Sequence, residues 1–172
     1  MRDLIKPTLS LTIICIVVSA ALGFTYTGTK AAIDERARID AENARKEVFA
    51  DAEKFEEVDN IADIAQGKTG LEAVTEAFKA IKGSETVGYV FTTTGKGYGG
   101  TIKIAVGIDT TGKITGMKIV EHSETPGLGS KAGEEPFNSQ FTGSAPQEPL
   151  KVVKNGKTKP EEIDAISGAT IT

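Results

Sequence analysis

The chain is poor in the residue types that build metal centres and covalent cross-links. Its 172 residues include one Cys, one His and no Trp. A single Cys excludes an intramolecular disulfide and a cysteine-cluster metal site, and a single His argues against a His-based zinc site. We therefore expect no bound metal, and only Phe and Tyr are available to stack on a ligand.

Basic residues are also in the minority. Lys and Arg number 20 against 24 Asp and Glu, which gives a net charge of −4. The chain thus lacks the basic surface that binds nucleic acid, and we expect no nucleic-acid partner. Its length suffices for one domain with a hydrophobic core. The 19 glycines lie mostly after residue 66 and predict turns and close backbone approaches there.

Charged residues are missing between Lys6 and Lys30, and this gap predicts a membrane anchor. Residues 9–24 form its apolar centre, and roughly 20 helical residues span the hydrocarbon core of a bilayer. Arg2 and Lys6 flank the N-terminal side, so the positive-inside tendency places Met1 in the cytoplasm. We expect a single-pass protein of the cell (inner) membrane, in contact with lipid, with everything after Lys30 on the outer face.

A cleaved signal peptide is the alternative for this segment. Residues 9–18 would be its short apolar region, and Ser19, Ala20 and Ala21 are the small residues that a signal peptidase requires. The uncharged stretch continues past that site to Thr29, which a cleaved signal does not need. We therefore favour the retained anchor.

A long helix is predicted next, because residues 31–60 contain no Gly or Pro. Apolar residues recur there at steps of three and four and trace one helical face: Ile33, Ala37, Ala41, Ala44, Val48, Ala52 and Phe55. Early members of this stripe are mostly Ala, so we expect a stalk first and docking by residues 48–55. A second, shorter helical or mixed stripe is expected over residues 71–81, closed by Gly83.

From residue 86 the hydrophobic period becomes that of β-strands. Strands are predicted at residues 87–91, 102–108 and 114–120, with a turn at 109–112 joining the last two into a hairpin and a bulge at Gly116. Another strand is expected at residues 150–154, with Asn155-Gly156 as its tight turn. Helices first and antiparallel strands after them indicate an α+β fold. The predicted organisation is an anchor (1–30), a helical stalk with docking helices (31–83) and a ligand-binding core (84–172).

Three glycine-containing stretches flank these strands. The first, residues 95–100, has neither the spacing nor the strand-then-helix setting of a nucleotide-binding loop, and by itself indicates a hairpin loop. The second consists of Glu124, Thr125, Pro126, Gly127, Leu128 and Gly129. A Leu between two glycines suits a surface that covers a flat ring, although a turn with one core Leu would have the same pattern. The preceding His122 is expected to be structural, because no nucleophile pairs with it.

The third stretch is the C-terminal segment, where small residues surround two Thr hydroxyls. It reads Asp164, Ala165, Ile166, Ser167, Gly168, Ala169, Thr170, Ile171 and Thr172. Its spacing alone indicates a loop with a helix cap.

This segment resembles a flavin-attachment motif in which an Asp precedes Ser/Thr-Gly-Ala-Thr. The motif is found in the G subunit of Rnf electron-transport complexes and in the C subunit of the sodium-pumping NADH:quinone reductase. Residues 124–129 and 97–100 resemble two further blocks of that family, in the same order along the chain. The short length favours the Rnf G subunit. Family members continue into a helix after the motif, whereas this sequence ends at Thr172.

The resemblance implies an electron-transfer subunit of a membrane redox complex of the ferredoxin:NAD oxidoreductase type, which moves Na⁺ or H⁺. Its cofactor would be FMN, joined covalently to Thr170 by a phosphoester bond that a flavin transferase forms. Asp164 would serve transferase recognition. The ring would rest on the second loop, and the implied flavin contacts are Ser167, Gly168, Ala169, Glu124, Thr125, Gly127, Leu128, Gly129 and Tyr98.

The implied partners are the other integral membrane subunits and the iron–sulfur subunits, since one Cys cannot ligate a cluster. No independent catalytic site is expected in this chain. Two other hypotheses remain open. One is a stand-alone membrane-anchored flavoprotein on the outer face, serving as a reductase component. The other is a sheet domain without redox function, in which the glycine-rich loops are only turns.

Overall fold

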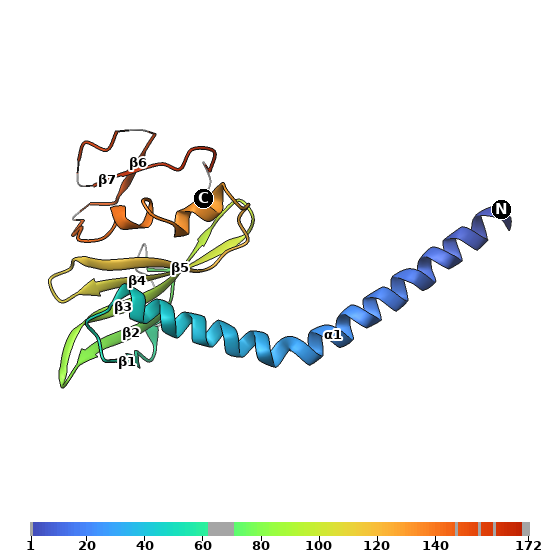
Figure 1. The fold of residues 1–172 in the computed structure, drawn as a ribbon, viewed down its shortest axis with the longest axis horizontal. Helices are drawn as coiled ribbons and strands as arrows, with labels where there is room; N and C mark the ends of the chain where they lie inside the picture. The colour runs from blue at the N-terminus through green and yellow to red at the C-terminus, as the bar shows by residue number, and fades with distance from the viewer. Residues whose placement is uncertain (1, 62–70, 147, 155, 160, 170–172) are drawn as a thin grey trace. The chain divides into compact units, whose positions relative to one another are not determined.

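The structure is a computed structural model, and it describes residues 2–61 (side chains from residue 5), 71–146, 148–154, 156–159 and 161–169. The chain forms two compact units, Met1–Asp40 and Ala41–Thr172. The first is part of one long helix, and the second contains the sheet and the loops that carry the motifs (Figure 1).

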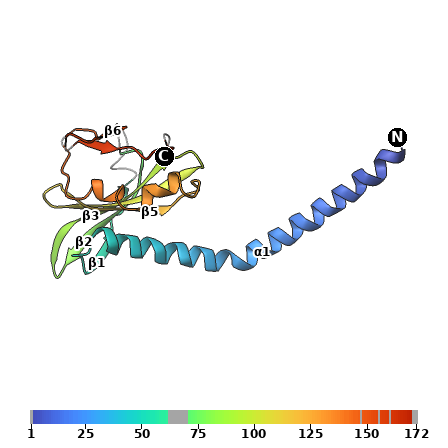
Figure 2. The same cartoon turned by 45° about the horizontal axis from the view of Figure 1, so that its top comes forward.

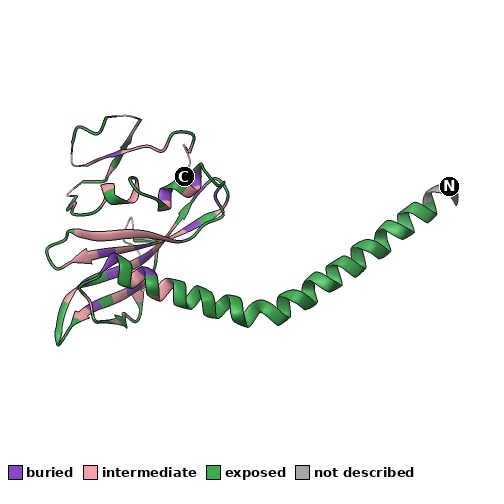
Figure 3. Cartoon of the chain, in the orientation of Figure 1, coloured by how far each residue is buried: buried purple, intermediate pink, exposed green. Residues whose placement is uncertain are grey.

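Helix α1 runs over Arg2–Val48. Its N-terminal part is long and apolar enough to cross a membrane, and the side chains of residues 5–40 are exposed (Figure 3). Hydroxyls in this segment donate to carbonyls of the preceding turn, as Thr12 does to Thr8 and Thr25 to Ala21, both at 2.9 Å. Such bonds satisfy polar groups that could find no water in a bilayer. The segment fits the predicted membrane anchor.

The predicted continuation of this helix to Phe55 is wrong. Helix α1 ends at Val48, and Phe55 lies in strand β1 (Lys54–Glu57). The hydroxyl of Thr115 donates to the Val48 carbonyl at 2.5 Å. A helix leaves its last carbonyls without partners, so this bond from the sheet caps the end of α1.

The sheet has five antiparallel strands in the order β1-β2-β3-β4-β5, the same as their order in the chain. After β1 come β2 (Val74–Lys82), β3 (Glu85–Lys96), β4 (Thr101–Asp109) and β5 (Ile114–Glu121). The predicted hairpin over residues 102–120 is confirmed. Its register shifts between the pairs Gly107–Gly116 and Ile108–Ile114, so the irregularity expected at Gly116 is present.

The helical stripe expected over residues 71–81 is not a helix, because residues 74–81 lie in β2 and residues 71–73 precede that strand. Phe78 pairs with Glu57 of β1 on one side and with Val90 of β3 on the other. Gly83, expected to close the helix, instead lies in the connection from β2 to β3 with a φ of +61°. Pairing with two neighbouring strands satisfies the backbone of this segment and overrides its helical spacing.

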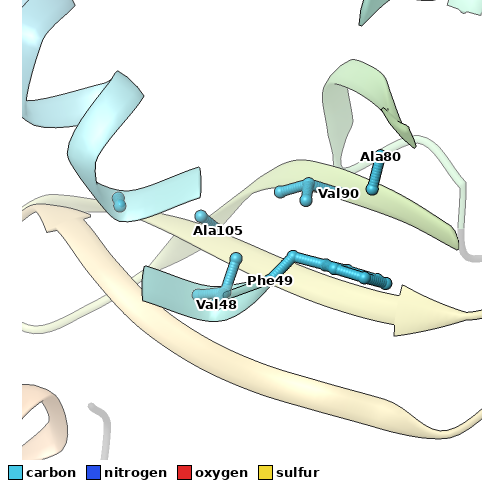
Figure 4. Close-up of a cluster of buried hydrophobic side chains, with 6 residues drawn as sticks. Val48, Phe49, Ala80, Val90 and Ala105 are labelled. Carbon is cyan, nitrogen blue, oxygen red and sulfur yellow. The ribbon is translucent and has the colours of Figure 1, made fainter. Parts of the chain in front are cut away.

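The end of α1 packs on one face of the sheet. Val48 and Phe49 form a core with residues of β2, β3 and β4, and Figure 4 shows them over Ala80, Val90 and Ala105. The fit depends on glycine: a Cβ on Gly88 would meet the Phe49 ring at 2.5 Å. This core joins the last turn of the helix to the middle of the sheet.

The elements that follow β5 cover the opposite face of the sheet (Figure 2). They are two 3₁₀ turns, η1 (Gly129–Gly133) and η2 (Asn138–Gln140), and strands β6 (Lys151–Val153) and β7 (Glu162–Asp164). The rings of Phe137 and Phe141 meet edge to face at 5.5 Å between centroids beside η2. An apolar cavity of about 270 Å³ lies between these elements and the sheet. Its lining residues are Ile102, Ile104, Met117, Ile119, Ala132, Phe137, Phe141, Leu150, Val152 and Ile163.

Strands β6 and β7 pair in parallel. The tight turn expected at 155–156 therefore closes no hairpin; Gly156 has a φ of +79°, and Asn155 lies outside the described residues. The α+β prediction is confirmed, with an N-terminal helix followed by a sheet that is mainly antiparallel. The division at residues 30 and 83 stays a prediction.

Candidate functional site

The first two loops meet through a buried carboxylate. Glu124, which follows β5, is 7% exposed and accepts a hydrogen bond from the backbone N–H of Gly99 at 2.8 Å. Gly97 and Gly99 lie in the tip of the β3–β4 hairpin. A side chain at Gly97 would clash with this carboxylate, and one at Gly99 would clash with the Ser123 carbonyl. Because Gly97 and Gly99 have no side chains, the tip can approach the second loop closely, and the charge-assisted bond to Gly99 holds it there.

The second loop contains a β-turn. The N–H of Leu128 donates to the Thr125 carbonyl at 3.1 Å, with Pro126 and Gly127 in the central positions. Gly127 has a φ of +77°, which is the arrangement of a type II turn with Pro at its second position. The turn displays Leu128 at its end, and this apolar side chain is 44% exposed.

The third loop contains a second such turn. The N–H of Ala169 donates to the Ile166 carbonyl at 3.1 Å, and Gly168 has a φ of +84°. A Cβ built at Gly168 would stand 3.1 Å from Cδ2 of Leu128, so the two turns are in contact. Ser167 and Gly168 are exposed, which leaves the turn accessible to another molecule.

The backbone before this turn is held on both sides. The N–H of Asp164 donates to Oε1 of Gln140 at 2.8 Å, and Nε2 of Gln140 donates to the Asp164 carbonyl at 3.4 Å. On the other side β7 pairs with β6, and the N–H of Ala165 donates to the Val153 carbonyl at 2.8 Å. The side chain of Gln140 thus takes the place that a further strand would occupy.

Two carboxylates of β7 also fold the loop that precedes it. Oδ1 of Asp164 accepts from the N–H of Lys157 at 2.9 Å. Oε2 of Glu162 accepts from the N–H and the hydroxyl of Thr158, each at 2.9 Å, and from the N–H of Lys159 at 3.2 Å. The backbone N–H and then the hydroxyl of Thr158 hold the pKa of Glu162 below its usual value of 4.5.

Two recesses adjoin these loops. One of about 540 Å³ is bordered by β7 and by η1 and η2. Its lining residues are Lys131, Glu134, Glu135, Pro136, Phe137, Gln140, Lys157, Asp164, Ala165 and Ile166. The other, of about 500 Å³, lies at the tip of the β3–β4 hairpin and includes Tyr98, which is 77% exposed. Both volumes lie within the range of small-molecule sites. Over the described part of the chain, no cluster of three His, Cys, Asp or Glu side chains could hold a metal ion.

The structure brings together most of the residues that the sequence singled out. Glu124 joins the hairpin tip, and Leu128 joins Gly168, so the three loops form one continuous surface. Tyr98 lies in the hairpin recess. Further residues with an implied flavin contact lie in the two turns or directly beside them: Thr125, Gly127, Gly129, Ser167 and Ala169. Thr170 lies outside the described residues, and its role, like the other assigned flavin contacts, stays a prediction.

Other residues were missed. Gln140 lies between Phe137 and Phe141, and nothing in the neighbouring sequence shows that its amide reaches a strand 24 residues away. Lys157 acts on Asp164 through its backbone N–H, which no side-chain pattern reports. His122 has the structural role expected of it, because its Nδ1 accepts from the N–H of Glu124 at 3.2 Å.

The chain is similar to several known proteins. Residues 97–172 match the FMN-binding domain family, and they include the second and third loops and residues 97–100 of the first, so these loops belong to an FMN-binding domain. Among solved structures, the C subunit of the Na(+)-translocating NADH-quinone reductase from Parabacteroides distasonis is 27% identical. It has a TM-score of 0.47 over 56% of this chain and 52% of that chain.

Several relatives match over nearly the whole chain, among them the following two. The G subunit of the Na(+)-translocating ferredoxin:NAD(+) oxidoreductase complex of Acetobacterium woodii is 40% identical, over 97% of this chain and 83% of the relative. The G subunit of the proton-translocating ferredoxin:NAD(+) oxidoreductase complex of Clostridium ljungdahlii is 33% identical, over 96% of this chain and 81% of the relative. The chain belongs to the family of G subunits of ion-translocating oxidoreductase complexes, as the three motifs predicted.

Proposed function

We propose that this chain is the electron-transfer flavoprotein subunit of a membrane ion-translocating complex, and that it carries FMN covalently on Thr170. The observation that supports this most is the match of nearly the whole chain to G subunits of such complexes, together with a match of the three loops to an FMN-binding domain. The complexes of the two relatives are named for ferredoxin and NAD as redox partners and for Na⁺ or proton translocation. We propose the same class of reaction here.

The described residues suit a flavin attached directly after the turn at residues 166–169, here called the motif turn. Ser167 and Gly168 are exposed, so an enzyme could reach the backbone beside the accepting hydroxyl. Leu128 touches Gly168 and exposes nearly half of its surface, which offers an apolar wall for a flat ring. The Glu124 carboxylate is nearly buried and accepts from the N–H of Gly99, which joins the hairpin tip to the loop that carries Leu128.

The attachment itself is a phosphoryl transfer. In the proposed step Oγ of Thr170 attacks the phosphorus of the FMN half of FAD, the Oγ–P bond forms, and the bond from that phosphorus to the bridging oxygen breaks. AMP leaves with the bridging oxygen, and the hydroxyl proton goes to a base or to water. A Thr hydroxyl is a weak nucleophile, so we assign its activation to a magnesium-dependent flavin transferase. The covalent bond retains the flavin on a face of the membrane that the cytoplasmic pool cannot replenish.

FMN, when bound, would supply transfer of electrons one or two at a time. The chain's single Cys cannot ligate an iron–sulfur cluster, so the donor and acceptor centres must lie on partner subunits. The role of this chain is to fix where the flavin can meet them. With α1 as the membrane anchor and Arg2 and Lys6 on its cytoplasmic side, we place Met1 in the cytoplasm and the sheet domain on the outer face.

Intact mass and in-gel fluorescence test the proposal. Full-length chain from cells that express a flavin transferase should fluoresce in a denaturing gel and carry the added mass of one FMN. Thr170→Ala should abolish both signals, and Thr172→Ala should leave both in place. An unmodified wild-type chain would contradict covalent attachment, and loss of the label in Thr172→Ala alone would move it to the other hydroxyl.

Purification in mild detergent tests the assignment to a complex. The labelled chain should copurify with integral membrane subunits and iron–sulfur subunits. A fully labelled chain that purifies alone from membranes would favour a stand-alone flavoprotein instead.

A further inference from the structure

The residue pair Gln140 and Asp164 has a role that the motif alone does not reveal. Asp164 begins the flavin-attachment motif, and its carboxylate would be assigned most simply to a contact with the transferase. In the structure that carboxylate already has a partner within the chain, because Oδ1 accepts from the N–H of Lys157 at 2.9 Å. Its backbone is held as well, by both polar atoms of the Gln140 side chain.

We propose that Gln140 and Asp164 are positioning residues that hold the motif turn in the register needed for flavin attachment. The inference rests on the proposed function and explains how this chain presents its hydroxyl. It replaces the hypothesis that the transferase recognises the Asp164 carboxylate directly.

The side-chain amide of Gln140 forms hydrogen bonds with both the N–H and the carbonyl of Asp164. These two bonds fix the rotation of the backbone at Asp164, where the motif begins. Beyond it, the chain is fixed by β6 through the bond from Ala165 to Val153, and then enters the turn closed by Ala169 and Ile166. Because the backbone is hydrogen-bonded on both sides up to residue 165, the chain enters this turn in a defined direction.

Lys157 completes the arrangement. Its N–H holds the Asp164 carboxylate, and its Nζ donates to the backbone carbonyl of Gln140 at 3.5 Å. The loop before β7, the strand and η2 are therefore linked through three neighbouring residues. Loss of the Gln140 amide would free the strand on one side while the parallel pairing with β6 remains.

Flavin attachment to the purified full-length apo-chain, in detergent with flavin transferase, FAD and Mg²⁺, tests this proposal. The measured quantities are kcat and KM for the chain as substrate. Gln140→Met has the same length and neither hydrogen bond, and we expect kcat/KM to fall on the order of tenfold, mainly through kcat. Thr142→Ala, at an exposed site two residues away, should react as the wild type does.

The role of Asp164 is tested by its charge. Asp164→Asn keeps an oxygen that can accept from Lys157 and should stay within about threefold of the wild-type rate, whereas Asp164→Ala should fall on the order of tenfold. If Asn and Ala variants lose the same activity, the transferase recognises the carboxylate itself and the proposal is wrong.

Folding and function are kept apart by two controls. Urea unfolding identifies any variant that is not folded; should Gln140→Met be one, Gln140→Glu decides, because it keeps the acceptor for the Asp164 N–H and loses only the donor. A folded Gln140→Glu chain with a lowered kcat supports the proposal, and wild-type kinetics in any folded Gln140 variant overturns it. A wild-type chain that accepts no flavin would instead refute the proposed function.

Discussion

The side chain of Leu128 lies against the backbone of Gly168, and a Cβ built on Gly168 would stand 3.1 Å from Leu128 Cδ2. The two residues belong to two separate turns, each with a glycine of positive φ in its third position. One turn follows β5 and the other follows β7. Their contact sets the distance between an exposed apolar side chain and the turn at residues 166–169, and a Cβ at residue 168 would force Leu128 to shift by a few tenths of an ångström.

Gly168→Ala should therefore weaken flavin attachment. An Ala at φ +84° costs about 1–2 kcal/mol in any setting, and its Cβ would also push Leu128 away from the turn. Gly143→Ala is the matched control, because Gly143 has a φ of +78° and open space around its Cβ position. We expect similar losses of unfolding free energy in urea, and slower attachment only in Gly168→Ala. Equal attachment rates in the two variants would show that the contact has no part in the site.

Glu124→Ala should loosen the tip of the β3–β4 hairpin. The change removes a nearly buried carboxylate and leaves the N–H of Gly99 without its acceptor, which should lower the unfolding free energy by about 1–3 kcal/mol. Hydrogen exchange of the Gly99 amide should accelerate as well. Glu121→Ala, at the exposed last residue of β5, should change the unfolding free energy by less than about 0.5 kcal/mol. Unchanged exchange at Gly99 in Glu124→Ala would contradict this linking role.

The sequence predicts elements whose cause is local. The anchor follows from a long uncharged run, and β4 from the alternation of residues 102–108. Residues 71–81 show the limit, because their apolar spacing fits a helix, yet the segment pairs with β1 and β3. The end of α1 is hidden for the same reason: no Gly or Pro marks it, and the hydroxyl that caps Val48 comes from Thr115.

For the site, the sequence identifies the loops but not the links between them. Gly97, Gly99 and Gly168 look like ordinary turn residues, and only the fold shows that Glu124, Ser123 and Leu128 occupy the space of their missing side chains. Gln140 carries no signal in one sequence, since its partners are backbone atoms of a distant strand. Motif order along the chain predicts a common surface, whereas the contacts within it depend on tertiary structure.

Phe49→Ala should destabilise the sheet domain strongly. The ring is 4% exposed and fills the space above Gly88, where a Cβ would approach it to 2.5 Å. Removing a buried Phe side chain costs about 3–5 kcal/mol, so the urea midpoint should fall sharply. Val152→Ala, at a side chain that is 72% exposed, should change the unfolding free energy by less than about 0.5 kcal/mol. A small effect of Phe49→Ala would mean that the end of α1 is not part of the core.

The loop before β7 should lose stability in acid, because the Glu162 carboxylate that holds it by hydrogen bonds becomes protonated. Hydrogen bonds from Thr158 and Lys159 lower the pKa of this carboxyl below 4.5 in the folded chain. A lowered pKa means that the ionised carboxylate stabilises the fold above the unfolded-state pKa, and that this contribution disappears as the pH falls through the folded-state pKa. The difference in unfolding free energy between wild type and Glu162→Gln should thus be constant near neutrality and shrink below about pH 4.5. Thr158→Ala removes one of the donors and should reduce this pH dependence. A difference that stays the same from about pH 7 to about pH 3 would show that these bonds do not distinguish the carboxylate from its protonated form.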